Sequence, residues 1–80
     1  MSFREDLLTF VRDEIISGGG AVDENEQLID RGFIDSMALL KITTFIEEQT
    51  GLRVPDDEVT PDNFQSVADM DRLVARLRAR

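Results

Sequence analysis

The chain has 80 residues, which suffices for one small domain and leaves too little for a second core. It contains no histidine, cysteine, tyrosine or tryptophan, so it lacks the usual proton shuttles, catalytic thiols and soft metal ligands. We therefore expect a single domain, residues 1–80, with no catalytic residues and no metal site.

The formal net charge of −8 indicates which partners the domain binds. An acidic surface repels phosphates, so proteins with basic patches suit it better than nucleic acid or anionic membranes. The same charge could simply keep a small protein soluble. No apolar run could span a membrane, and the first six residues do not resemble a signal peptide, so we expect a cytoplasmic monomer without membrane insertion.

The first predicted helix runs from about Phe3 to Ser17. Ser2 and Glu5 have the spacing of a capping box, which satisfies backbone donors at a helix start. Apolar residues then recur at helical spacing: Phe3, Leu7, Leu8, Val11 and Ile15. The glycines at 18–20 favour a helix stop and a flexible exit.

A long irregular segment is predicted from Gly18 to Asp35, because its sequence follows neither the helical nor the strand period. Four apolar residues should hold it against the helices: Val22, Leu28, Phe33 and Ile34. Ordered loops of this length are uncommon in compact domains and are often functional.

Part of this segment alternates like the start of a calcium loop, at Asp23, Asn25 and Gln27. Leu28 and Ile34, however, occupy the positions that would need glycine and the bidentate glutamate. Calcium binding is therefore not expected.

Three further helices are predicted. The second spans Ser36 to Thr50 and ends at Gly51, with Leu52 packing back on its last turn. An irregular connection follows, and then a short helix from Pro61 to Phe64 with Thr60 as its cap. Ser66 precedes a last helix whose apolar residues share one face: Val67, Met70, Leu73, Val74 and Leu77.

The distinctive feature is the Asp35-Ser36 pair, where the long loop meets the second helix. Gly32 lies upstream and Met37 follows. Either Asp35 or Ser36 could simply be the N-cap of the helix. In this context the pair resembles the prosthetic-group site of the acyl carrier protein family, in which Gly-x-x-Asp-Ser or Gly-x-Asp-Ser precedes a large apolar residue at the start of the second helix. The resemblance extends over nearly the whole chain.

The resemblance implies an all-α bundle of three main helices and one short helix, with the long loop between the first two. It also implies that Ser36 carries a 4′-phosphopantetheine arm taken from coenzyme A, and that Asp35 contacts the phosphopantetheinyl transferase that installs the arm. A phosphodiester on Ser36 would lie at the positive end of the helix. The thiol of the arm would supply the group that this cysteine-free chain lacks for thioesters.

The cargo is less defined. Typical fatty-acid carriers have several acids after the modified serine, whereas Ala38 and Lys41 stand in that region here and Glu47 and Glu48 remain. The longer spacing from Gly32 to Ser36 and the Pro61-Asp62-Asn63-Phe64 turn resemble those of stand-alone aminoacyl or specialised acyl carriers, including D-alanyl carriers. This resemblance implies an acyl- or aminoacyl-loading ligase or transferase and downstream acyl-transferring enzymes as partners. A carrier for fatty-acid or polyketide synthesis is the alternative. A second alternative is an acidic helical interaction module without a prosthetic group.

A helical turn of about 100° per residue divides the second helix into two faces. Leu39, Ile42 and Ile46 form the predicted core stripe, with Phe45 at its flank. The opposite face is the predicted docking surface for partner enzymes, because exposed apolar residues rimmed by charge are typical of interfaces. It comprises Met37, Leu40, Lys41, Thr44, Glu47 and Glu48.

Overall fold

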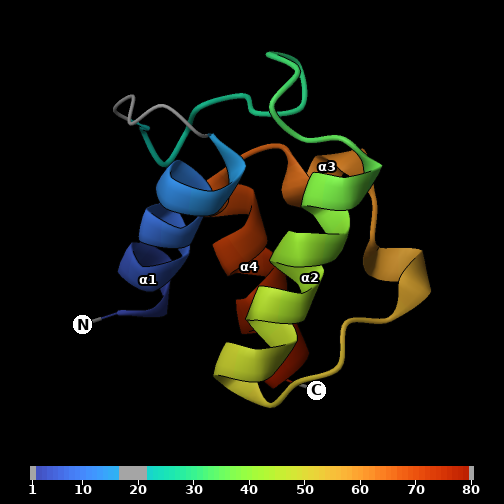
Figure 1. Ribbon diagram of the computed structural model, residues 1–80. Coiled ribbons are helices and arrows are strands. Elements are labelled where there is room, and N and C mark those ends of the chain that lie inside the picture. Colours follow the sequence, from blue (N-terminus) through green and yellow to red (C-terminus); the bar gives the residue numbers. More distant parts are fainter. Residues whose placement is uncertain (1, 17–21, 80) are drawn as a thin grey trace.

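The computed structural model describes residues 2–16 and 22–79. These residues form α1 (Phe3–Phe10), the π-helical turn η1 (Val11–Ile15), α2 (Ser36–Thr50), the 3-10 turn η2 (Asp56–Glu58), α3 (Pro61–Phe64) and α4 (Val67–Arg78), and they include no strand. In Figure 1, α4 lies behind α1 and α2, and the chain that leads to α2 crosses one end of the bundle. The predicted all-α fold, with three main helices and one short one, is confirmed.

One core joins all these elements, and α4 contributes most to it. Its buried apolar face consists of Val67, Met70, Leu73, Val74 and Leu77, as predicted. Against this face pack the fully buried side chains of α1, η1, the long loop, α2 and α3: Leu7, Val11, Leu28, Ile42, Ile46 and Phe64. With no disulfide possible, burial of these apolar side chains is the main source of stability.

The first helix differs from the prediction after Phe10. The Ser2 cap is present, since its hydroxyl accepts a hydrogen bond from the Glu5 N–H at 3.1 Å. Beyond Phe10 the helix widens, and the Ile16 N–H bonds to the Val11 carbonyl, five residues back. This wider turn brings Ile16 over Val11, so Ile15 and Ile16 both pack on the core. The predicted end at Ser17 and the glycine stop lie outside the described residues.

The second helix has the predicted bounds, Ser36–Thr50, and Gly51 ends it in the left-handed conformation at φ 71°. Its core stripe is shifted from the prediction. Ile42 and Ile46 are fully buried as expected, but Ala38 is the third buried residue, whereas Leu39 and Phe45 are only partly buried. Phe45 stacks on Phe10 of α1, with ring centroids 4.3 Å apart, so it joins these two helices.

The connection between α2 and α4 is more regular than predicted, because Asp56–Glu58 form one 3-10 turn. The bounds of the short helix α3 are as predicted, yet the Thr60 side chain makes no capping hydrogen bond. Within α3, the side-chain amide of Asn63 donates a hydrogen bond to the Glu58 carbonyl at 2.7 Å. This bond ties α3 to the end of η2. Ser66 caps α4 by accepting from the Asp69 N–H.

The described part of the long loop is irregular, as predicted, and Leu28 is its anchor. The Leu28 side chain is fully buried, while Val22, Phe33 and Ile34 are partly buried against the same core. The backbone of Leu28 is also paired, because its N–H donates to the Gln65 carbonyl at 2.7 Å and its carbonyl accepts from Phe33 at 2.9 Å. The turn between them requires the positive φ of Gly32, 80°, which glycine adopts without steric cost.

Arg4 of α1 links the long loop and α4 through ion pairs. Its guanidinium bonds to Asp71 of α4 at 2.9 Å and to Glu24 of the loop at 3.2 Å. The hydrogen bond to Asp71, followed by that to Glu24, raises the pKa of Arg4 above its usual value. The Glu24 carbonyl also accepts from the Ala68 N–H at 2.9 Å. The loop is thus held at both Glu24 and Leu28.

Within residues 2–16 and 22–79, no helix combines the length and the apolar character that crossing a membrane would require.

We predict that Leu28→Ala destabilises the domain by about 2 to 5 kcal/mol, because it leaves a cavity at the fully buried loop anchor. In a domain of this size each kcal/mol lowers the melting temperature by about 4 to 8 °C. The matched control is Leu40→Ala, since Leu40 is 62% exposed. Thermal unfolding of both variants tests the prediction, and equal melting temperatures would contradict the anchoring role.

Candidate functional site

The site begins where the loop enters α2. Asp35 is the N-cap, and its Oδ1 accepts a hydrogen bond from the Ala38 N–H at 2.8 Å. Ser36 is therefore the first helical residue rather than the cap, which resolves the two possibilities left by the sequence. The cap determines where the helix starts and hence where the Ser36 hydroxyl lies.

Ser36 is exposed, and so are its neighbours Asp35 and Met37. Its hydroxyl stands at the N-terminal end of a 15-residue helix, where the aligned peptide dipoles concentrate partial positive charge. A phosphodiester formed on this oxygen would be favourably placed. The residues present thus fit a phosphate-linked prosthetic group.

A pocket of about 290 Å³ opens beside Ser36 and Asp35. The loop contributes one wall through Ile29 and Ile34, and Leu39 of α2 lies between the walls. The segment leading into α3, together with α3 itself, forms the other wall through Val59, Thr60, Pro61 and Phe64. The lining is mostly apolar, so the pocket favours a small apolar group.

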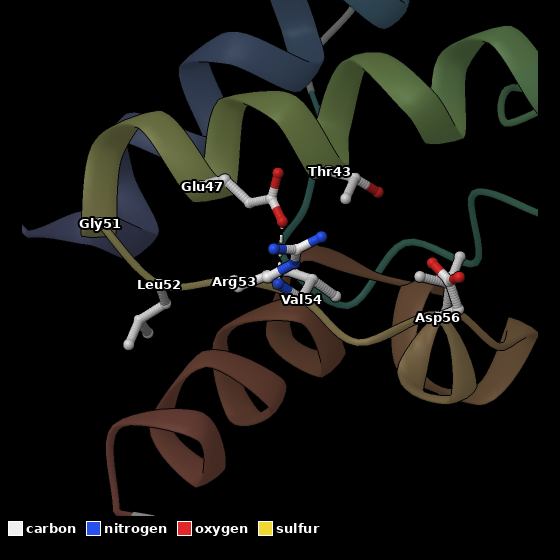
Figure 2. A pocket seen from close by; sticks show the side chains of 8 residues that line it. Thr43, Glu47, Gly51, Leu52, Arg53, Val54 and Asp56 are labelled. Carbon is white, nitrogen blue, oxygen red and sulfur yellow. Dashed lines mark hydrogen bonds between the residues drawn. The ribbon is translucent and has the colours of Figure 1, made fainter.

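Two further hollows continue this pocket along α2. The first, about 420 Å³, also borders Ser36 and extends over Leu40 and Thr43 to Asp56. The second, about 430 Å³, lies between the C-terminal half of α2 and the following connection. Figure 2 shows this far end, where Glu47 points from α2 toward Val54. Because neighbouring hollows share lining residues, together they form one groove that starts at Ser36.

Five of the six predicted docking residues are exposed on α2: Met37, Leu40, Lys41, Thr44 and Glu48. Met37 and Leu40 are the two large apolar side chains that are most accessible among the described residues, at 64% and 62%. Leu40, Lys41, Thr44 and Glu48 border a shallow hollow between α1 and α2, whose floor includes the stacked pair Phe10 and Phe45.

Glu47 differs from the rest of this set. It is partly buried, and its Oε2 accepts a hydrogen bond from the Val54 N–H at 2.9 Å, drawn in Figure 2. This bond fastens the connection after α2 to the helix. Glu47 therefore has a structural role that the helical pattern alone could not reveal, and its replacement would disturb the groove.

Sequence reasoning also missed Gln65. Its Oε1 accepts from the Ile29 N–H at 2.9 Å and from the Asp30 N–H at 3.0 Å, across 36 and 35 positions of sequence. A polar residue in the short connection between α3 and α4 gives no sign in the sequence of such a distant contact. Its position directly after Phe64, which lines the pocket, could have drawn attention to it.

No family model matches the chain. Among curated proteins, the chain is 34% identical over 53 residues to aminoacyl carrier protein 1 of Bradyrhizobium diazoefficiens, an alignment that covers 66% of this chain and 58% of that protein. It is 29% identical over 79 residues to the D-alanyl carrier protein of Listeria monocytogenes, covering 99% and 97% of the two chains.

Two solved structures are similar to the chain in fold. One chain in a crystal structure of an FAD-dependent dehydrogenase superposes with a TM-score of 0.80 at 27% identity and covers 86% of this chain and 99% of that one. A crystal structure of the Bradyrhizobium japonicum glycine:[carrier protein] ligase complexed with glycylated carrier protein gives a TM-score of 0.69 at 27% identity, covering 90% and 99%.

The fold and these similarities are those of helical carrier-protein domains. The chain is similar to members of the acyl carrier protein family, in agreement with its sequence resemblance.

Proposed function

We propose that the chain is a non-catalytic, single-domain carrier of the cytoplasm that holds acyl or aminoacyl groups as thioesters on a 4′-phosphopantetheine arm at Ser36. The observation that carries this proposal is the exposed Ser36 hydroxyl on the first turn of α2, fixed by the Asp35 cap. The relatives named as carrier proteins support it.

Attachment of the arm needs a nucleophilic oxygen that an enzyme can reach. In the transfer from coenzyme A, the Ser36 oxygen forms the new phosphodiester bond, its proton leaves to a base of the transferase, and the nucleotide part of coenzyme A departs. Asp35 contributes by starting the helix at Ser36, and its exposed carboxylate is a contact for the transferase. The bound arm supplies a thiol that forms thioesters.

The cargo that we propose is an amino acid or a related short acyl group. Similarity to aminoacyl and D-alanyl carrier proteins, and to the carrier bound by a glycine ligase, supports an aminoacyl-loading ligase as a partner. The small apolar pocket beside Ser36 supports short rather than long cargo. A fatty-acid or polyketide carrier, and an interaction module without the arm, remain the alternatives to test.

We predict that Ser36→Ala abolishes loading and leaves the fold intact. Because Asp35 rather than Ser36 caps α2, the substitution removes no capping hydrogen bond. The check is the intact mass after treatment with coenzyme A, magnesium and a broad-specificity transferase, together with a thermal unfolding curve. Ser66→Ala is an unsuitable control, since Ser66 caps α4, so the exposed Thr9→Ala serves instead. Loading of Ser36→Ala would refute the assignment.

We predict that the holo protein accepts amino acids in preference to long acyl chains. The measurement offers it in parallel to amino-acid adenylating ligases and to malonyl and fatty-acyl transferases, and thioester formation is followed by mass. Faster loading by the malonyl or long-chain route would support the fatty-acid alternative. If the protein never acquires the arm, the interaction module becomes the better interpretation.

The docking surface that we propose consists of Met37, Leu40, Lys41, Thr44 and Glu48. Its apolar centre is exposed without a packing role, and the net charge of −8 suits enzymes that present basic patches. Glu47 was predicted to belong to this surface, but we leave it out of the test because its carboxylate bonds to Val54. Met37 lies next to Ser36 and can repack against several partners.

We predict that Leu40→Ala and Glu48→Lys each slow transfer from a loading ligase on the order of fivefold, since contact residues that matter at interfaces contribute about 1 kcal/mol or more. The melting temperature should hardly change. Glu5→Lys, the same charge change at an exposed position on α1, is the control and should leave transfer unaltered. Added salt should reduce the effect of Glu48→Lys more than that of Leu40→Ala. Unchanged rates in both variants would exclude this surface.

A further inference from the structure

Gln65 connects the two walls of the pocket beside Ser36. Its backbone carbonyl accepts from the Leu28 N–H at 2.7 Å, and its side-chain oxygen accepts from the N–H groups of Ile29 and Asp30. One residue thus holds three successive residues of the loop. Ile29 lines one wall of the pocket, and Phe64, the residue before Gln65, lines the other.

These hydrogen bonds have no substitute in the surrounding backbone. The loop lies in neither a helix nor a strand there, and the N–H groups of Leu28, Ile29 and Asp30 have Gln65 as their partner. The Gln65 amide also donates to Asp30 Oδ1 at 3.4 Å, which orients its oxygen toward the two N–H groups. The buried side chain of Leu28 anchors the loop, and the Gln65 side chain holds the two residues after it, one of which lines the pocket.

We infer that Gln65 is a positioning residue that holds the loop wall of the pocket beside Ser36 in place, so that this pocket encloses short aliphatic cargo better than long chains. The inference rests on the proposed function, because the cargo reaches the pocket from an arm on Ser36. A volume of about 290 Å³ lies at the lower end for ligand pockets, so a short group fits inside the pocket, whereas a long chain would have to extend out of it into the more open hollows along α2.

The first test uses the protein without an arm. Gln65→Ala should speed hydrogen exchange of the Ile29 and Asp30 amides on the order of tenfold, because each loses its hydrogen-bond partner. Gln49→Ala is the matched control, since Gln49 is exposed on α2. The paired substitution Gln65→Glu with Asp30→Asn keeps the total charge, retains the accepting oxygen and reverses the amide–carboxylate pair, so it should restore slow exchange.

The second test measures selectivity. A broad-specificity transferase loads each variant from coenzyme A thioesters that carry either a short branched or a long straight acyl group, and the rates of thioester hydrolysis are compared. In the wild-type domain, the thioester of the short group should hydrolyse about threefold more slowly than that of the long group. A difference of this size corresponds to the burial of about one methylene group. Gln65→Ala should lose this difference, whereas Gln49→Ala and the paired variant should keep it.

The outcomes distinguish the two claims. If the wild-type protein cannot be loaded, the proposed function is wrong. If it loads normally but Gln65→Ala keeps the wild-type ratio of hydrolysis rates, or leaves exchange at Ile29 and Asp30 unchanged, the inference about Gln65 is wrong. A ratio that falls in Gln65→Ala and returns in the paired variant would support it, because a general loss of stability would not be reversed by exchanging the two polar groups.

Discussion

The placement of Ser36 depends on how the chain before it is fastened to the helices. A loop without regular structure cannot satisfy its own backbone, so its position must come from a few specific contacts. Here the burial of Leu28 supplies the apolar anchor, and the joint between α3 and α4 supplies the hydrogen bonds, through Gln65. Arg4 adds an ionic link to Glu24. Together these contacts fix the path of the loop up to Asp35, the N-cap of α2.

The same arrangement explains why a small domain can present a reactive group without enclosing an active site. Apart from Ser66, the buried side chains of the described residues are apolar, and most of them belong to one core to which α4 contributes most. Under the proposed function, chemistry on the cargo comes from partner enzymes, which need an exposed attachment point and a recognisable surface. Ser36 and the apolar residues Met37 and Leu40 lie together on the first turns of α2, so the proposed attachment point and the proposed docking surface are adjacent.

The sequence predicted the helices well because their signals are local. Asp35, Gly51 and Ser66 mark helix ends through capping, and α4 has an unambiguous apolar face. Prediction from the sequence failed where a structural feature depends on contacts between residues that are distant along the chain. Nothing near Val11 in the sequence indicates the π-helical turn, through which both Ile15 and Ile16 pack on the core. The bonds of Glu47 to Val54 and of Gln65 to the loop likewise follow from tertiary packing.

The central claim is that one serine of this chain bears the prosthetic group, and locating that group tests the claim most directly. Protein purified from its native host, or treated with coenzyme A and a broad-specificity transferase, is digested and its peptides are fragmented in a mass spectrometer. The account predicts phosphopantetheine on Ser36 and on none of Ser2, Ser17 or Ser66. Phosphopantetheine on another residue, or its absence from the protein under both conditions, would contradict it.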